Sequence, residues 1–560
     1  MKSELDPIRL EIIANGLRSI ADECFVALMR SSYSTNIKER KDHSVAIVDI
    51  KGRLVVQAAL TLPLHIASMG GLMQCVLEKF GEDIQEGDIF VANDPHTAGG
   101  THLPDINYAM PVFIEGKLVA FICNIAHHAD IGGMVPGSMA GGMSEIFQEG
   151  LRIPVVRLFR KGELQRDIMD ILMLNVRVPE ERQGDHNAQI ASCRLGERRF
   201  KEVVKTHGLR AVLSAFDEII ARTFKRMKDT IRQIPDGVYE FSDYMDSDGL
   251  NSFNVPVCLK LTVQGDRIHL DFSGTSPQTK GNINTTLNAV QASVNYALIG
   301  ALDSEMPSNQ GALDAVDILC EPGTVLNCIF PAPVAARAHV CQRVIDVVLG
   351  ALAQAIPDKV IAAANGANTT AVFSGVDPRT SKPYLYFETI GGGMGARATK
   401  DGKDGVQVGI TNTSNLPVES IEQEYPIRVE EYGFVQDSGG AGQYRGGMGL
   451  RRVLIPVDHE CVFNGAGERF KYQPWGLFGG KDGGSGQFLI EDKKGKRRLD
   501  DKPIEVEVTL GTKITVETPG AGGYGPPDKR SSAACMDDLD SGKFSQKYMH
   551  ENYPTQIGKK

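Results

Sequence analysis

The sequence lacks several features that would point to common protein classes. Its ten cysteines form no Cys-x-x-Cys pair, which excludes a zinc ribbon and a dithiol redox site. Cysteines in apolar surroundings, such as Cys258, are expected to be small buried residues in a reducing compartment. No apolar run reaches the roughly 18 residues of a membrane span, and no apolar signal region follows the charged N-terminus. We therefore expect a cytoplasmic protein.

Clustered positive charge and a phosphate-binding loop are also missing. The 560-residue chain has 60 Lys and Arg against 70 Asp and Glu, a net charge of −10 that is spread along the sequence. A nucleic-acid partner would require basic residues gathered on one face, so none is expected. No glycine-rich stretch fits G-x-x-x-x-G-K-[ST]. The chain therefore has no P-loop, and we expect these glycines in tight turns of a β-rich region.

The chain does contain alternating strand-like and helix-like segments over a length that requires several packing units. We predict an α+β fold, mixed and multi-domain. A helix-and-strand N-terminal unit, which carries the candidate site residues described below, is followed by a glycine-rich, β-rich half. The predicted units are residues 1–236, a central α/β unit at 237–420, a β-rich unit at 421–525 and a polar, loosely attached tail at 526–560.

Hydrophobic periodicity places the elements within these units. A helix is predicted from Pro7, another over Glu197–Gln233, and two more near Leu287–Leu302 and Cys341–Ile356. Strands are predicted at Ser44–Asp49, Leu54–Gln57, Ile89–Ala92, Tyr108–Phe113, Leu118–Ile125, Tyr239–Tyr244, Val255–Val263 and Arg267–Phe272. The strands on either side of Glu115–Gly116 are expected to pair as a hairpin.

Two predicted loops at strand ends hold most of the chemically informative residues. They are 93–105 and 124–133, and together they contain four of the twelve histidines. His102 and Asp105 lie three residues apart, and a second strand delivers His127 or His128. Alternation along a strand sends these two rings to opposite faces, so at most one is a ligand. The other is expected to support the site from behind or to be a satisfied core histidine. Imidazole and carboxylate groups on converging loops suit Zn, Mn or Fe.

Other charged residues have two readings each. Asp42 lies in the charged loop 34–44, which by itself is typical of a solvated surface. Arg337 and His339 are expected either to contact a substrate or partner, or to form a structural ion pair.

Several segments taken together resemble the hydantoinase B family. They are 34–44, 93–105, 127–133, 136–139, 175–182 and the glycine-rich stretches 437–447 and 518–525. The family supplies the B subunits of ATP-dependent hydantoinases, 5-oxoprolinases and other lactamases, with acetone and acetophenone carboxylase subunits as distant relatives. The resemblance implies a metal site made of Asp42, His102, Asp105 and His127. His96 stands where relatives often have Tyr, so it is not included.

The resemblance also implies a mechanism that needs a partner. ATP, with Mg, would bind a hydantoinase A-type subunit in an (αβ)2 heterotetramer and phosphorylate the oxygen of a cyclic amide. This chain would then supply a water activated by a divalent metal, with Zn expected first and Mn or Fe as alternatives. Asp130 and His128 would orient that water or carry its proton, unless they only form buried hydrogen bonds. The alternatives are a subunit of an ATP-dependent ketone carboxylase and a scaffold for the A subunit with a structural metal.

Overall fold

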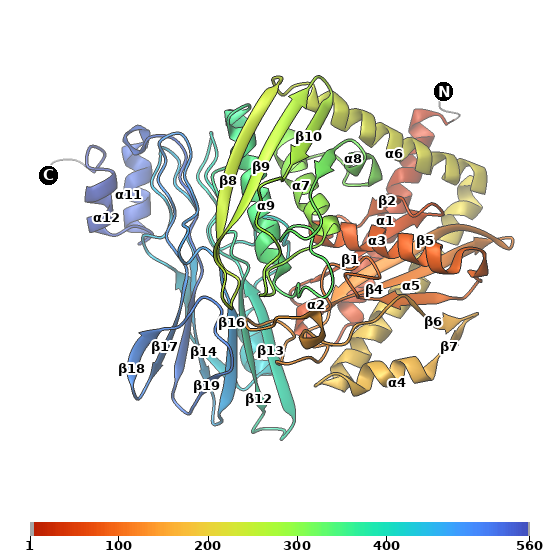
Figure 1. Ribbon diagram of the computed structural model, residues 1–560, viewed down its shortest axis with the longest axis horizontal. Helices are drawn as coiled ribbons and strands as arrows, with labels where there is room; N and C mark the ends of the chain where they lie inside the picture. Colours follow the sequence, from red (N-terminus) through yellow and green to blue (C-terminus); the bar gives the residue numbers. More distant parts are fainter. Residues whose placement is uncertain (1–4, 558–560) are drawn as a thin grey trace.

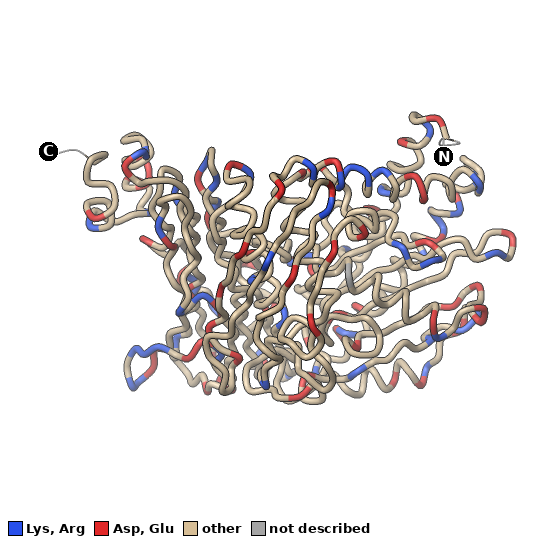
Figure 2. The backbone as a smooth tube through the Cα atoms, turned by 45° about the horizontal axis from the view of Figure 1, so that its top comes forward, with Lys and Arg blue, Asp and Glu red and all other residues tan. Residues whose placement is uncertain are grey.

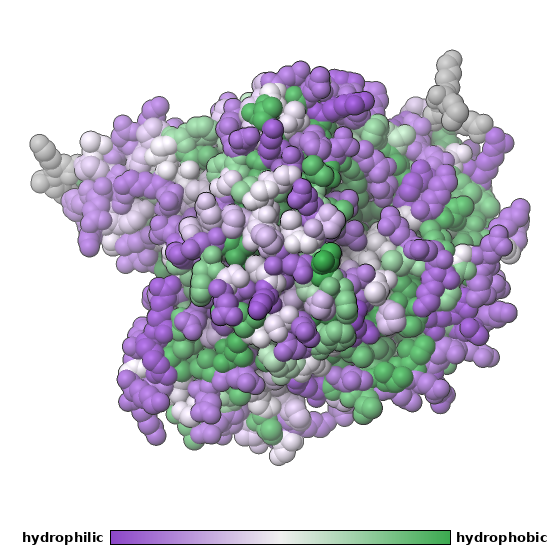
Figure 3. All heavy atoms as spheres, in the orientation of Figure 1, coloured by the Kyte–Doolittle hydropathy of each residue, from purple (hydrophilic) through white to green (hydrophobic). Residues whose placement is uncertain are grey.

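The computed structural model describes residues 5–557 and is built from helices and four sheets (Figure 1). This agrees with the predicted mixed fold. Within the described part of the chain, none of the helices combines the length and the apolar character that a bilayer crossing requires. Acidic and basic residues are mixed along the backbone, and the basic run at 493–498 is confined to one short hairpin (Figure 2). The face drawn in Figure 3 shows small apolar patches between hydrophilic residues.

The N-terminal unit is a seven-stranded antiparallel sheet in the order β2-β1-β5-β4-β3-β6-β7. Its strands are β1 (His43–Asp49), β2 (Leu54–Gln57), β3 (Ile89–Ala92), β4 (Asp105–Ile114), β5 (Lys117–His127), β6 (Val156–Arg160) and β7 (Glu163–Leu164). Its helices are α1 (Pro7–Ser31), α2 (Thr35–Lys38), α3 (Pro63–Phe80), α4 (Arg166–Leu174), α5 (Pro179–His207) and α6 (Leu209–Ile231). The strands predicted in this region are all present, and β4 pairs with β5 as expected.

Helices cover both faces of this sheet. The apolar stripes of α1, α5 and α6 pack on one face, and α3 packs on the other. Helix α1 begins where Asp6 accepts a hydrogen bond from the backbone N–H of Arg9 at 3.1 Å, with Pro7 in the first turn. The predicted helix over 197–233 is two helices, because Gly208 adopts a positive φ of 83° between them.

The central part contains a four-stranded sheet in the order β11-β10-β9-β8 and a group of apolar helices that pack against it. These elements are β8 (Gly237–Ser247), β9 (Phe253–Gln264), β10 (Arg267–Asp271), β11 (Asp317–Leu319), α7 (Leu287–Leu302), α8 (Gln310–Leu313) and α9 (Arg337–Ala353). Every residue of α9 is buried. This helix therefore runs through the interior of the molecule, and its first turn reaches the site described below.

The C-terminal part is two sheets that share one apolar core. One has the order β13-β12-β16-β19 and the other β14-β15-β20-β17-β18. The elements are β12 (Thr369–Val376), β13 (Pro383–Ile390), α10 (Val418–Glu424), β14 (Ile427–Phe434), β15 (Leu450–Pro456), β16 (Cys461–Ala466), β17 (Gln487–Asp492), β18 (Gly495–Arg498), β19 (Val506–Val508) and β20 (Lys513–Glu517). The predicted boundary at residue 420 is wrong, since strands on both sides of it form one sheet.

The glycine-rich stretches pack against one another instead of forming isolated tight turns. The N–H of Gly447 bonds to the carbonyl of Met394 at 2.9 Å, and the N–H of Ala521 bonds to that of Gly447 at 3.1 Å. A Cβ on Gly447 would lie 1.9 Å from the Lys403 carbonyl oxygen, so only glycine allows the segments to approach this closely.

The prediction of a loosely attached tail is also wrong. Residues after 525 form α11 (Ser532–Asp540) and α12 (Gln546–Asn552), which bury Phe544 and Tyr553 against Ala441 and Met448. A buried ion pair at 2.6 Å joins Arg530 to Asp538. Apolar residues spaced among the polar ones therefore hold the tail to the C-terminal sheets.

Candidate metal centre

Strand register brings together residues that lie far apart in the sequence. Asp105, the first residue of β4, pairs with His127, the last residue of β5. On the other side of β5, strand β1 pairs His43 with Ala126, so Asp42 lies next to His127. The backbone N–H of His127 donates to the carbonyl of Asp42 at 3.0 Å. One edge of the sheet therefore carries two carboxylates and an imidazole.

His102 completes a compact group from the loop that precedes β4. Its Nδ1–H donates to the carbonyl of Ala335 at 3.1 Å, which leaves the lone pair of Nε2 directed into the site. Nε2 lies 3.1 Å from Oδ1 of Asp105, yet both atoms are buried without a hydrogen-bond partner. Ligand atoms of His102, Asp105 and His127 all lie within 4.8 Å of one another. Unpaired acceptor atoms of nitrogen and oxygen at this spacing fit a divalent cation.

Asp42 lines the same small cavity of about 40 Å3, although its carboxylate stands outside that closest trio. It is only 7% exposed, so it is not a solvated surface charge. Its Oδ2 lies 3.9 Å from Nη1 of Arg40, and its Oδ1 lies 3.8 Å from Nε2 of His65.

His65 is a residue of this cavity that the sequence did not reveal. It lies in the first turn of α3, where Oγ of Ser44 is 2.8 Å from Nδ1 of the ring. The same Oγ accepts the backbone N–H of Leu62 at 3.0 Å, so its proton is free for Nδ1 of His65. Nε2 of His65 lies 3.6 Å from Oδ1 of Asp105. A single histidine in an apolar helix gives no signal of such a place.

Arg337, the first residue of α9, forms an ion pair with the carboxylate of Asp105. Its Nε also donates to Oγ1 of Thr101 at 2.8 Å. Of the two readings for Arg337, the structure therefore shows an ion pair, and one that belongs to the cavity wall. His339 is buried but is not part of that wall.

Burial and neighbouring charges set the protonation of the group. Burial raises the pKa of Asp42. At Asp105 burial acts in the same direction, but His102 and Arg337 outweigh it and hold the pKa of that carboxyl well below its usual range. Burial and then the charge of Arg337 lower the pKa of His102, and burial lowers that of His127. The lowered pKa values of His102, His127 and Asp105 favour two neutral rings beside an ionised carboxylate, which is the state that binds metal.

Asp130 and His128 do not lie in this cavity. The carboxylate of Asp130 accepts hydrogen bonds from backbone N–H groups of Gly132 and Gly137, and it forms an ion pair with Arg177 at 2.8 Å. Nε2 of His128 donates to Oε1 of Gln189 at 2.9 Å, and burial lowers its pKa to about 3. The structure therefore gives these two residues contacts with the loop and with α5 and no place in the cavity wall, and their service to a metal-activated water stays a prediction.

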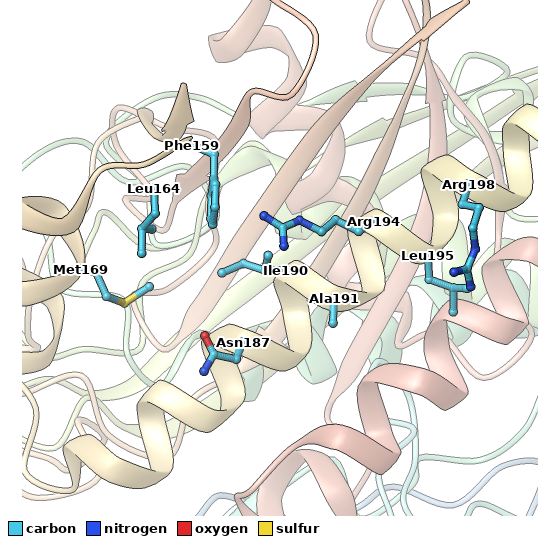
Figure 4. A pocket seen from close by; sticks show the side chains of 9 residues that line it. All are labelled: Phe159, Leu164, Met169, Asn187, Ile190, Ala191, Arg194, Leu195 and Arg198. Atoms are coloured by element: carbon cyan, nitrogen blue, oxygen red, sulfur yellow. The ribbon is translucent and has the colours of Figure 1, made fainter. Parts of the chain in front are cut away.

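Two other features lie apart from the centre. Nε2 of His96 donates to the carbonyl of Ala332 at 3.0 Å, in keeping with its exclusion. Figure 4 shows a second hollow, of about 480 Å3, lined by Phe159, Leu164, Met169 and one face of α5. No acidic residue, histidine or cysteine lines it, and its two arginines point in different directions. It therefore offers no catalytic group.

Comparisons with known proteins agree with this architecture. The family model described as hydantoinase B/oxoprolinase matches residues 6–527. The caprolactamase subunit beta of Pseudomonas jessenii is 30% identical over 97% of this chain and 94% of its own length. An uncharacterized protein of Methanocaldococcus jannaschii is 36% identical over 99% of this chain and 97% of its own. For 5-oxoprolinase 1 of Arabidopsis thaliana the identity is 34%, over 93% of this chain but only 42% of that protein.

Solved structures share the fold over nearly the whole chain. The crystal structure of the ATP-dependent caprolactamase from Pseudomonas jessenii has a TM-score of 0.92 at 27% identity, covering 98% of this chain and 96% of that chain. Nucleotide-free acetone carboxylase has a TM-score of 0.91 at 20% identity, covering 98% of this chain and 80% of that chain, and it shows a common fold. The match of the family model over 6–527, with full-length relatives above 30% identity, establishes that this chain belongs to the hydantoinase B/oxoprolinase family.

Proposed function

We propose that this chain is the B (beta) subunit of an ATP-dependent cyclic-amide hydrolase, which opens a hydantoin, 5-oxoproline or related lactam ring. The observation that carries the proposal is the buried group of His102, Asp105 and His127, in which acceptor atoms face one another without hydrogen bonds. The names of the caprolactamase and 5-oxoprolinase relatives support the same reaction class.

An unstrained amide resists hydrolysis because its carbonyl carbon is a poor electrophile and its nitrogen is a poor leaving group. ATP overcomes this when its terminal phosphoryl group is transferred to the amide oxygen, which makes the ring carbon electrophilic. Water then adds to that carbon, and the C–N bond breaks as the ring nitrogen takes a proton, which leaves an acyl phosphate. A second water cleaves this acyl phosphate, and the products are the ring-opened acid, ADP and phosphate. This chain has no P-loop, so ATP and Mg would bind an A-type partner subunit in an (αβ)2 assembly.

The residues that would hold a divalent ion, Zn first and Mn or Fe as alternatives, are Asp42, His102, Asp105 and His127. When bound, such an ion acts as a Lewis acid and lowers the pKa of a water molecule, to about 7 for Zn. The carbonyl of Ala335 keeps the proton of His102 on Nδ1, so Nε2 stays available as a ligand.

Two buried arginines add positive charge near the same carboxylates. Arg337 pairs with Asp105, and Arg40 lies behind the cavity wall, where it donates to Thr389 and Thr413. Their charge would attract the anionic phosphoryl group of an activated amide. The apolar side chains of Leu64 and Phe387, which also line the cavity, would exclude bulk water from it.

The two rival functions make different demands on the same centre. A ketone carboxylase subunit would use an enolate and an activated bicarbonate, and the shared fold does not separate it from a hydrolase. A scaffold with a structural metal would need closed coordination by protein ligands. Orphaned ligand atoms beside a cavity favour a centre that also receives an external molecule.

The experiment is reconstitution. Three samples would be prepared, namely this chain alone, an A-type partner subunit alone and the two together. Each sample would be given ATP, Mg and a panel of lactams and hydantoins. We expect ring opening and ADP release in the mixture only. Carboxylation of acetone or acetophenone without lactam turnover would replace the proposal by the carboxylase. Full activity of the A-type subunit without this chain would leave it a scaffold.

A further inference from the structure

One neutral side chain in the cavity wall has an unused hydrogen-bonding atom. Apart from its histidines, the uncharged polar residues of that wall are Asn368, Thr389, Thr411 and Thr413. The hydroxyl groups of the three threonines are all hydrogen-bonded. In contrast, Oδ1 of Asn368 is buried and has no partner among the described residues. A buried amide oxygen without a partner is costly, so its presence beside a cavity needs an explanation.

The backbone conformation of Asn368 also gives no structural reason for an asparagine at this position. Its φ is +41°, a left-handed conformation that side chains disfavour, and asparagine tolerates it mainly by bonding to the nearby backbone. Here Oδ1 makes no such bond, and the turn is held instead by Oγ1 of Thr370, which donates to the Asn368 carbonyl at 3.0 Å. Glycine would adopt this conformation without strain. The fold therefore gains nothing visible from the carboxamide, which points to a ligand.

We infer that Asn368 determines substrate specificity by accepting a hydrogen bond from the ring N–H of the cyclic amide. The inference rests on the proposed hydrolase function, and it names the part of the substrate that is read. A lactam or hydantoin presents one carbonyl and one N–H along the amide bond that is cleaved. Asn368 lies in the wall of the same cavity as His102 and Asp105, so the two ends of that bond have separate partners.

At about 40 Å3 the cavity has room for the amide end of such a ring but not for the whole ring. Leu64, Met139 and Ile410 are buried apolar residues of the cavity and border that amide end. They provide no hydrogen bond, so they would not distinguish one ring nitrogen from another. An N-methyl group would leave Oδ1 of Asn368 unpaired and would press a methyl carbon against it. Sites built around a buried hydrogen bond discriminate strongly against ligands that lack it.

The test uses the complex with its A-type partner, ATP and matched pairs of lactams with N–H or N-methyl at the cleaved amide. For the wild-type complex we expect kcat/KM to favour the N–H compound by roughly 10- to 100-fold. Asn368→Gly removes the carboxamide and relieves the left-handed φ, so it should fold at least as well as wild type. Its preference for N–H should fall to near unity, mainly through a higher KM, while metal content measured by elemental analysis stays unchanged.

Asn254→Gly is the matched control, because Asn254 also has a positive φ, of 58°, but lies exposed in β9. It should keep the full preference. An Asn368→Gly complex with the wild-type KM and the wild-type preference would show that Asn368 is only a turn residue and would overturn the inference. A wild-type complex that opens no cyclic amide would instead overturn the proposed function, and the inference with it.

Discussion

Helix α9 contributes to two groups of buried charged side chains. The two groups differ in whether their buried acceptor atoms have hydrogen-bond partners. The first residue of α9, Arg337, reaches the candidate metal centre. Further along, Arg343 and Asp346 belong to a second group that also includes Asp243 of β8. We call it the inter-sheet charge cluster, and its members are Asp243, Asp246, Arg343, Asp346, Glu468, Arg469 and Lys502.

The inter-sheet charge cluster uses its acceptors fully. Asp243 accepts from Arg343 at 3.1 Å, from Arg469 at 2.8 Å and from Nε1 of Trp475 at 3.2 Å. Glu468 accepts from Nζ of Lys502 at 2.8 Å. Among the described residues, none of the buried carboxylate oxygens of this cluster lacks a hydrogen-bond partner. It therefore joins β8, α9 and the segment after β16 through filled carboxylate acceptors, and its unpaired atoms are nitrogen donors of Arg343 and Arg469.

At the metal centre, equally buried acceptors are left open. Nε2 of His102, Oδ1 of Asp105 and Oδ1 of Asn368 all lack a hydrogen-bond partner. Burial alone thus does not separate a binding site from a structural ion-pair network. Unpaired acceptor atoms around a cavity do separate the two, because burying an acceptor without a hydrogen bond costs free energy that only a bound ligand would offset.

The largest effect is expected from substitutions that remove an imidazole from the candidate metal centre. His102→Ala or His127→Ala should remove the bound metal and lower activity of the reconstituted enzyme on the order of 10³-fold or more, since no neighbouring side chain replaces an imidazole ligand. Unfolding temperature should fall as well, because metal binding stabilises the folded chain. Elemental analysis and turnover measure both, with the exposed His550→Ala as control. A full complement of metal in both variants would contradict the ligand assignment.

A substitution in the inter-sheet charge cluster should have the opposite effect, with a loss of stability but no loss of metal. Arg343→Met should destabilise the chain by about 3–5 kcal/mol, because it removes one of the three cations that face four buried carboxylates. The folded fraction should keep its metal. Denaturant unfolding and metal analysis test this, with Arg232→Met as the exposed control, which should cost less than about 1 kcal/mol. Loss of metal in Arg343→Met at a temperature where it is folded would link the two groups after all.

The sequence allowed much of the N-terminal sheet to be predicted, but not how its edge forms the centre. Alternating apolar residues placed β1 to β5 well, and His102, Asp105 and the pair His127–His128 stood out in strand-end loops. The choice of His127 over His128 came from the family resemblance. Asp42 could be proposed only from the family resemblance. The pairing of β1 with β5 places it next to His127, and sequence spacing does not reveal that pairing.

His65 and α3 were missed for a physical reason. Helix α3 contains Gly70 and Gly71, which weaken helix propensity, and its apolar residues do not form one clear stripe. Gly71 is needed because a Cβ there would lie 2.6 Å from the carbonyl oxygen of Gly99, in the loop that carries His102. Close packing of helix and loop thus overrode local preference, and it placed His65 beside the carboxylates.

Asp42 tests the centre more finely. Asp42→Asn keeps the size of the side chain but removes an anionic donor, so turnover should fall by roughly 100-fold even with metal in excess. The fold should persist, because burial raises the pKa of Asp42 and its ionised form is costly to the chain. Metal titration and kinetics check this, with exposed Asp170→Asn as control. Near-normal turnover with normal metal content would move Asp42 out of the site.

The smallest expected effect concerns how the inter-sheet charge cluster responds to pH. Four buried carboxylates, of Asp243, Asp246, Asp346 and Glu468, face three cations, so the cluster carries an excess of negative charge when all are ionised. Burial raises the pKa of Glu468 from its ordinary value of 4.5 to about 7, although Lys502 opposes the shift. The folded chain therefore holds a proton on Glu468 that the unfolded chain releases near pH 4.5.

A raised carboxyl pKa gives stability that is complete below about pH 4.5 and is lost as the pH rises through about 7. Glu468→Gln resembles the protonated form at every pH, so it should not show this loss. Relative to wild type, the free energy of unfolding of Glu468→Gln should improve by roughly 1–3 kcal/mol between pH 5 and pH 8. Denaturant unfolding at several pH values measures the difference, and exposed Glu460→Gln should run parallel to wild type throughout. Parallel curves for Glu468→Gln as well would mean that Glu468 is ionised in the fold and that Lys502 outweighs its burial. The cluster would then carry its excess charge elsewhere, and Asp346, whose pKa burial raises well above its usual range, would be the carboxyl that keeps the proton.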